Sequence, residues 1–312
     1  MTQHSTVPAD RTETTTPTLP PELGNIVRRG DRVLAVGPGP LAIALADRTA
    51  CQVISVHATL ADVEAVRAPL GPRGRAAATV DAQVDDLAAG RPEHGPYNVI
   101  VVTAGISGLS PQWVRQLTPR GVIVAPLALG GLHPWTVAGR DRYDHLWYGQ
   151  VLGVDPVGTG PQPATGPLNP GIRPGPDNHG ELPAPRLAAE WAGALPPRLT
   201  RTEYLSLWLW LASHDDRITT AEAADTGEGP GAALVDGSSA VHITPHGLWL
   251  TDTEPSTMAL AQHVADRIAR WGQRCPHLTQ LTCRLASPSG AGPDALLAPG
   301  NWSTDRVATL PR

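Results

Sequence analysis

A glycine- and proline-rich turn follows the first strongly apolar run of the chain. Residues 32–36 predict a buried strand, and Gly37-Pro38-Gly39-Pro40 then turn the chain into a helical stretch over 41–48. Such a turn lets a ligand approach the backbone, and the helix N-terminus offers N–H donors to it. His57 lies twenty residues past Gly37, where nucleotide-binding folds usually carry an Asp or Glu that holds ribose hydroxyls. These positions leave two interpretations open, a nucleotide site and a purely structural turn. The turn alone favours the structural interpretation, because the two prolines lack N–H groups and His57 has no carboxylate to hold a diol.

The elements around this turn alternate between strand and helix patterns. Strands are predicted over 32–36, 52–56, 77–80, 98–103 and 121–125, and helices over 41–48, 60–68 and 111–117. This alternation predicts an α/β fold with a parallel sheet covered on both faces. Two further strands, over 135–139 and 145–151, lie on either side of the polar run Arg140-Asp141-Arg142, so the sheet is expected to end in an antiparallel hairpin.

Composition shifts divide the chain into four predicted regions. Residues 1–22 are polar and rich in Thr and Pro and predict a disordered tail, and 23–155 form the α/β domain. Fifteen of the 31 residues over 156–186 are Gly or Pro, which predicts a linker without helix or strand. Residues 187–312 predict a smaller α+β domain with a helix over 202–212, a strand meander over 233–251 and a helix over 256–271 ended by Gly272.

Charge and cysteine content narrow the function classes. A net charge of −5 and a pI near 6.1 disfavour a nucleic-acid binder. No apolar run is long enough to span a membrane, and residues 1–20 hold no apolar core of a signal peptide. Three cysteines without a CxxC pattern fit a reducing cytoplasm. His242 and His246 fall in a strand and a turn, so no metal site is expected.

A longer motif lies upstream of the fourth predicted strand. Residues 90–104 read Gly-Arg-Pro-Glu-His-Gly-Pro-Tyr-Asn-Val-Ile-Val-Val-Thr-Ala, and this segment resembles a motif of the protein-L-isoaspartate O-methyltransferases. Residues 117–126 resemble the family's Leu-x-Pro-Gly-Gly strand, and 30–34 and 53–56 resemble its first two strands. The resemblance covers roughly residues 24–139. A weaker likeness joins the region after 186 to a C-terminal extension found in actinobacterial, modified-peptide-associated members.

The resemblance implies a Rossmann-like class I methyltransferase sheet and S-adenosylmethionine as cofactor. It implies methylation of an Asp or isoaspartyl carboxylate in a protein or a ribosomally made peptide. The residues it places at the cofactor are Gly37, Gly39, His57 and Asp86, of which Asp86 matches the family's acidic residue near the adenine. The catalytic residues are not assigned. The chemistry needs little acid–base help, because a carboxylate is already nucleophilic, so catalysis rests on positioning.

Several departures from the family pattern keep a second hypothesis open. Ala35 and His57 stand where the family has acidic residues, the third glycine of the turn is missing, and residues 1–22 hold no equivalent of the family's Ser/Thr-x-Pro segment. These departures favour a catalytically degenerate subunit that binds a peptide, or a partner such as a second methyltransferase or a maturation enzyme. A nicotinamide-dependent oxidoreductase shares the glycine turn but not the motif over 90–104. Trp208 and Trp210 fit core packing better than a peptide-binding face.

Overall fold

The computed structural model describes residues 23–38, 41–70, 80–103, 105–106, 108–143, 145–153, 178–182, 186–187, 199–223, 230–237, 239–274, 276–287, 295–304 and 310. The predicted tail over 1–22 and the turn residue Gly39 lie outside these ranges, as does most of the predicted linker. None of the helices in the described part of the chain has the length and apolar character needed to cross a membrane.

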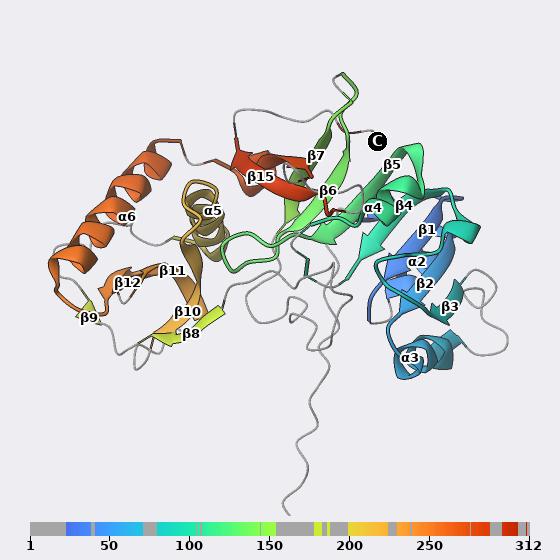
Figure 1. The fold of residues 1–312 in the computed structure, drawn as a ribbon, viewed down its shortest axis with the longest axis horizontal. Coiled ribbons are helices and arrows are strands. Elements are labelled where there is room, and N and C mark those ends of the chain that lie inside the picture. Colours follow the sequence, from blue (N-terminus) through green and yellow to red (C-terminus); the bar gives the residue numbers. More distant parts are fainter. Residues whose placement is uncertain are drawn as a thin grey trace, which may run out of the picture.

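Nine strands of the described residues form one sheet, in the order β15-β14-β7-β6-β5-β4-β1-β2-β3 (Figure 1). The strands β1 to β5 pair in parallel, whereas β6 is antiparallel to both β5 and β7. This arrangement confirms the predicted parallel sheet with an antiparallel hairpin after its fifth strand. The bounds are β1 (Arg32–Val36), β2 (Gln52–His57), β3 (Val80–Val84), β4 (Tyr97–Val102), β5 (Leu117–Pro126), β6 (Trp135–Arg140), β7 (Trp147–Gly153), β14 (Thr282–Ala286) and β15 (Ala298–Ser303).

The apolar strands of this sheet bury both faces, because successive side chains point to opposite sides. In β4, Val99 and Val101 join a core with α1 (Leu23–Ile26), α2 (Leu41–Thr49) and α3 (Leu60–Leu70). Ile100 and Val102 join the opposite core, which includes Trp113 of α4 (Pro111–Arg115). β1 and β5 divide their side chains in the same way. Continuous apolar runs therefore predicted the sheet correctly, since both of its faces are covered.

The edges of the sheet differ most from the sequence-based prediction. β3 begins at Val80, the residue where the predicted third strand over 77–80 ends. β14 pairs with β7, and β15 pairs with β14. Part of the region 187–312, expected to form a separate domain, thus belongs to the first sheet. Short runs such as Ala-Pro-Gly-Asn-Trp-Ser in β15 carry no strand pattern, and the open edge of β7 decides their pairing.

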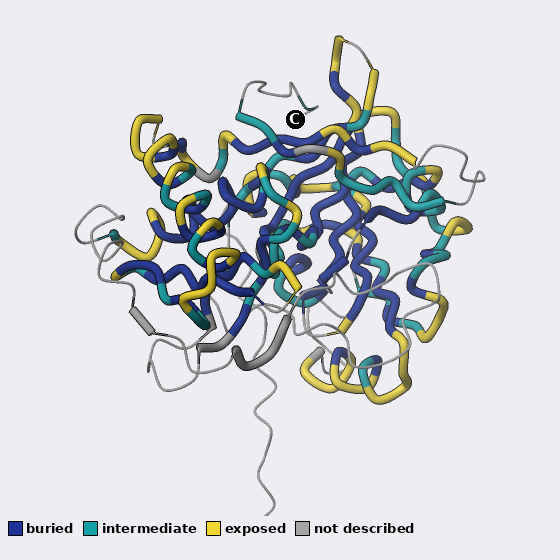
Figure 2. The backbone as a smooth tube through the Cα atoms, turned by 60° about the vertical axis from the view of Figure 1, so that its left-hand side comes forward, coloured by how far each residue is buried: buried dark blue, intermediate teal, exposed yellow. Residues whose placement is uncertain are grey.

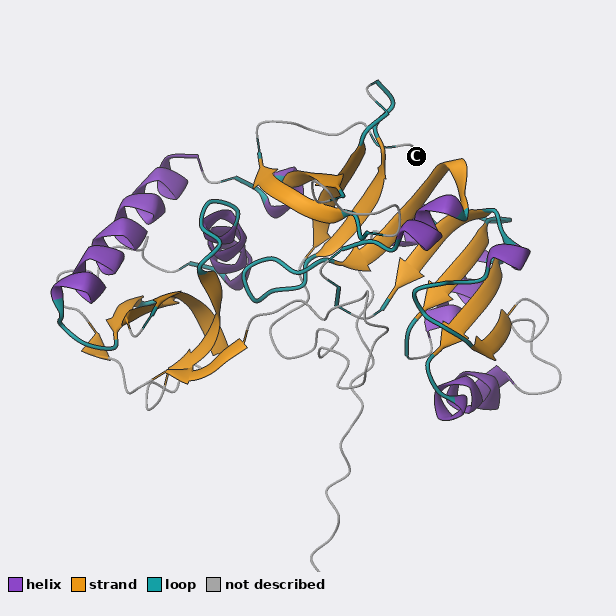
Figure 3. Ribbon diagram, viewed as in Figure 1, coloured by secondary structure: helices purple, strands orange, loops and turns teal. Residues whose placement is uncertain are grey.

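A second sheet has the order β8-β10-β11-β12-β13-β9 (Figure 3). Its predicted meander is confirmed in β11 (Pro230–Asp236), β12 (Ser239–Thr244) and β13 (Gly247–Leu250), whereas β10 (Ile218–Ala223) was not predicted. β8 (Asn178–Leu182) and β9 (Arg186–Leu187) lie in or at the end of the interval predicted to hold no strand. The linker prediction is wrong there, because an edge strand needs only a ladder partner and shows no apolar alternation. α6 (Pro255–Arg274) also runs past Gly272, which does not end it.

α5 (Arg201–Ala212) joins the two sheets into one core. It begins with a capping box between Thr200 and Glu203, and Trp208 and Trp210 are 0% and 3% exposed. The indole Nε1 of Trp208 donates to the carbonyl of Gly130, in the connection between β5 and β6, at 2.7 Å. Buried residues accordingly run continuously between the sheets (Figure 2). The core-packing interpretation of these tryptophans is confirmed.

Candidate functional site

The carboxyl ends of β1, β2, β3 and β4 meet at one edge of the first sheet, the place where open α/β sheets bind ligands. Gly37 follows β1, His57 ends β2, Asp86 follows β3, and Thr103 follows β4. Backbone hydrogen bonds join these positions: Gly37 N–H to Val56 O at 3.0 Å, Asp85 N–H to His57 O at 3.1 Å, and Thr103 N–H to Val36 O at 2.9 Å. Three of the four residues predicted from the sequence are thus brought to one edge, and Gly39 lies outside the described residues.

The described half of the glycine turn is occupied by bonds within the protein. Gly37 has a φ of +108°, a conformation that only glycine adopts readily, and its N–H is used by Val56 O. Pro38 has no N–H, and its carbonyl accepts a hydrogen bond from Thr103 Oγ1 at 3.0 Å. Neither Gly37 nor Pro38 therefore offers an N–H to a ligand. Thr103, which sequence reasoning treated only as part of a motif, ties the turn to the end of β4.

His57 is turned into the protein. Its side chain is fully buried, and Nε2 lies 2.7 Å from the hydroxyl of Ser55, two residues earlier on the same strand face. Burial lowers the pKa of His57, although the charge of Asp62 acts in the opposite direction. The ring is therefore neutral near pH 7, and its Nδ1 is buried without a partner among the described residues. To contact a ligand at the edge, the imidazole would have to leave this position.

Asp86 is exposed and lies on a braced loop. Its Oδ1 accepts the N–H of Ala88 at 2.9 Å, so the carboxylate also shapes the turn that carries it. The neighbouring Asp85 pairs with Arg91, and this contact lowers the pKa of the Asp85 carboxyl. Arg91 also pairs with Glu93 at 2.7 Å. Asp86 thus presents a carboxylate at a defined place on the edge.

α4 supports the same loop from the protein side. The hydroxyl of Ser110 caps α4 and donates to Ala88 O at 2.7 Å. The indole of Trp113 donates to Leu87 O at 2.8 Å, and the amide of Gln116 donates to Ala89 O at 2.6 Å. Because Trp113 lies in α4 and Ser110 and Gln116 cap its two ends, the loop position follows the helix position.

A histidine that the sequence did not single out lies at this edge of the sheet. His133 belongs to the connection from β5 to β6, and its ring packs on Gly105, just after β4. A Cβ at Gly105 would come within 2.6 Å of His133 Cδ2, so only glycine leaves room for the ring. Burial lowers the pKa of His133, and its Nε2 has no hydrogen-bond partner in the described part of the chain. Sequence reasoning missed it because no motif surrounds it.

The chemistry available at this edge is polar binding. The side chain best placed to bind a ligand is the exposed Asp86 carboxylate, because Nε2 of His133 is buried. Within the described ranges, no group of three His, Cys, Asp or Glu side chains is placed to hold a metal ion. His242, considered above with His246, is fully buried in β12.

Comparison with known proteins finds similarity for the first part of the chain. Residues 19–151 match the family model of protein-L-isoaspartate(D-aspartate) O-methyltransferase. A protein-L-isoaspartate O-methyltransferase of Methylorubrum extorquens (strain PA1) is 38% identical over 129 residues, which are 40% of this chain and 55% of that protein. The enzyme of the same name from Methylorubrum populi is 33% identical over 129 residues, 40% of this chain and 59% of that protein.

The chain thus spans little more than half the length of these curated relatives. A solved structure named protein-L-isoaspartate O-methyltransferase is 18% identical, with a TM-score of 0.39 over 84% of this chain and 74% of that chain. Residues 19–151 are therefore similar to the protein-L-isoaspartate(D-aspartate) O-methyltransferase family.

Proposed function

We propose that the chain is a protein-L-isoaspartate O-methyltransferase-like enzyme. It transfers the methyl group of S-adenosylmethionine to an Asp or isoaspartyl carboxylate in a protein or a ribosomally made peptide. The observation that carries this proposal is the family match over 19–151, a segment whose strands bring Gly37, Asp86 and Thr103 to one sheet edge.

The reaction makes few demands on the residues at this edge. A carboxylate is nucleophilic at neutral pH, so the protein has to align its oxygen with the methyl group and exclude water. The cofactor, when bound, supplies the activated methyl group. The exposed Asp86 fits a hydrogen-bond acceptor for such a cofactor, since its loop is held by Ser110, Trp113 and Gln116.

The positions on β1 and β2 do not fit the cofactor as well. Ala35, where the family carries Glu, is 3% exposed inside the helix-covered core. The His57 ring is directed to Ser55, and Gly37 and Pro38 have no N–H to offer. These contacts favour the second candidate function, a degenerate subunit that binds a peptide or a partner enzyme. In that case a second methyltransferase or maturation enzyme performs the chemistry.

Calorimetric titration of the full chain with S-adenosylmethionine and S-adenosylhomocysteine separates the two. The enzyme proposal expects micromolar Kd values and methyl transfer to an isoaspartyl peptide. Asp86→Asn removes the charge but keeps an oxygen for Ala88 N–H, and it should weaken cofactor binding about tenfold or more. Glu64→Gln, on the exposed side of α3, is the matched control and should leave binding unchanged. Absence of binding at millimolar cofactor would overturn the enzyme proposal in favour of the degenerate subunit.

A further inference from the structure

A hollow of about 950 Å³ opens at the edge of the first sheet opposite to the one that carries Gly37, Asp86 and Thr103, which we call the cofactor edge. It lies where β5 begins, β6 ends and β7 begins. The six residues of β4, at about 3.3 Å each, place the two edges about 20 Å apart. The residues that line it are Val114, Arg115, Leu117, Thr118, Pro119, Arg120, Gly121, Arg140, Asp141, Arg142, His145 and Trp147.

The lining is strongly basic in a chain whose net charge is −5. Arg120, Arg140 and Arg142 are exposed, and among the described residues none of the three makes an ion pair or a side-chain hydrogen bond. Among the described residues of the lining, Asp141 is the only acidic one. It is 2% exposed, and its Oδ1 accepts the N–H of Tyr143 at 2.8 Å, so it serves the turn. The positive charge in the hollow is therefore largely uncompensated.

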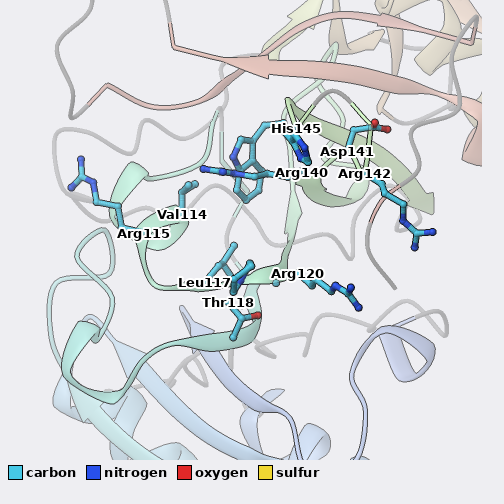
Figure 4. Close-up of a pocket in the computed structure, with 12 residues that line it drawn as sticks. Val114, Arg115, Leu117, Thr118, Arg120, Arg140, Asp141, Arg142 and His145 are labelled. Atoms are coloured by element: carbon cyan, nitrogen blue, oxygen red, sulfur yellow. The ribbon is translucent and has the colours of Figure 1, made fainter.

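Two irregular segments bring these side chains together. Between Tyr97↔Leu117 and Val99↔Val122 the β4–β5 ladder shifts register, so residues 118–121 bulge out of it and carry Arg120. The second segment is the turn after β6, where Asp141 O accepts the N–H of His145 at 3.1 Å. Figure 4 shows Arg120 and Arg142 on one side of the hollow and Arg115 on the other, with Arg140 and His145 above Leu117 and Thr118. Residues from three strands thus converge on one space.

The lining also has an apolar component next to the charges. Trp147 and Leu117 are half-buried in the hollow, and Tyr143 and Leu146 beside it are 76% and 37% exposed. The planar guanidinium groups match carboxylates with paired N–H donors. Aromatic and aliphatic surface between them suits the side chains of a polypeptide rather than a bare anion.

We infer that this hollow binds an acidic peptide segment of another protein, with carboxylates on Arg120, Arg140 and Arg142 and apolar side chains against Trp147 and Leu117. A nucleic acid fits less well, because nucleic-acid binders follow the phosphate backbone along an extended basic stripe, whereas these arginines lie within one hollow beside Trp147 and Leu117. This docking surface stands independently of methyl transfer, since it shares no residue with the cofactor edge. It would hold a second protein by a segment distant from its reacting carboxylate. This contact would raise the effective concentration of that carboxylate at the cofactor edge.

The test is fluorescence anisotropy of the full chain without cofactor. The probe is a fluorescein-labelled 12-residue peptide of alternating Glu and Leu, and its Gln-for-Glu counterpart is the comparison. The triple variant R120A/R140A/R142A should weaken binding of the Glu peptide about tenfold, because each of the three exposed ion pairs that it removes strengthens binding a few-fold. The variant R267A/R270A/R274A removes the same charge from α6 and should bind as the unchanged chain does. Binding should also weaken between 50 and 300 mM salt.

Any of these results would overturn the inference: no binding of the Glu peptide, equal binding of the Gln peptide, equal losses in the two triple variants, or tighter binding of a single-stranded DNA 12-mer. Displacement of the peptide by millimolar inorganic phosphate alone would likewise refute it, because a simple anion site would then explain the data. Circular dichroism of both triple variants checks that they are folded before binding is compared.

Discussion

Replacing Trp208 tests whether the two sheets share one core. The side chain is fully buried in α5, and its Nε1 donates to Gly130 O at 2.7 Å. Truncating a buried Trp to Ala removes about 3–5 kcal/mol, and the lost hydrogen bond contributes about 1 kcal/mol of such an effect. We expect Trp208→Ala to lower the free energy of unfolding by about 4 kcal/mol, a large part of the 5–15 kcal/mol typical of a domain.

Urea unfolding followed by far-UV circular dichroism and by tryptophan fluorescence measures this change. Trp208→Phe keeps an aromatic ring but loses the N–H, and it should cost about 1–2 kcal/mol. Tyr143→Ala, at a position 76% exposed, is the aromatic control and should stay within about 0.5 kcal/mol of the unchanged chain.

Both probes should shift together, because the buried cluster that holds Trp208 includes strands of both sheets. The reasoning fails if Trp208→Ala lowers stability by less than about 1.5 kcal/mol, well below the range for a buried Trp. It fails equally if the second sheet unfolds in a separate transition while the first keeps its midpoint.

Three further predictions concern buried or strained positions. Burial lowers the pKa of His242 to about 4, whereas the unfolded chain takes up this proton near pH 6.5. The free energy of unfolding should therefore fall by about 3 kcal/mol as the pH drops from 6.5 to 4. In urea titrations, His242→Gln should flatten this pH dependence. Gly131→Ala should destabilise severely, since a Cβ there lies 2.2 Å from a backbone nitrogen, whereas Gly237→Ala, with open space, should cost only about 1–2 kcal/mol in thermal melts. Hydrogen bonds from Arg217 lower the pKa of Asp215. Asp215→Asn should therefore lower the free energy of unfolding by about 2 kcal/mol at pH 7. This difference should vanish only at strongly acid pH, where the native carboxyl is protonated.

Much of the first sheet could be predicted from the sequence. The runs at Arg32–Val36 and Tyr97–Val102 are apolar on both faces and short, which only a covered parallel sheet accommodates. The motif around residues 90–104 also indicated the family now matched over 19–151. Placing Gly37 and Asp86 at one edge followed directly, because both come after parallel strands.

Contacts between distant segments could not be predicted in this way. β14 and β15 join the first sheet because β7 has an open edge. The residues of β14 and β15 themselves carry no pattern that predicts this pairing. His133 reaches Gly105 through a connection between strands, and the basic hollow gathers side chains from three strands and a bulge. Each of these depends on which elements lie side by side.

The sequence by itself determined the parallel sheet and the order of residues along the edge where its strands end, since strand and turn propensities act over a few neighbouring residues. It also indicated the family whose model matches residues 19–151. Only the tertiary structure decided what those residues face. His57 lies at the predicted position, yet its ring turns to Ser55, and Arg120 and Arg140, twenty residues apart, line one hollow. Side-chain direction depends on burial and on partners from other elements, and those are set when the chain packs.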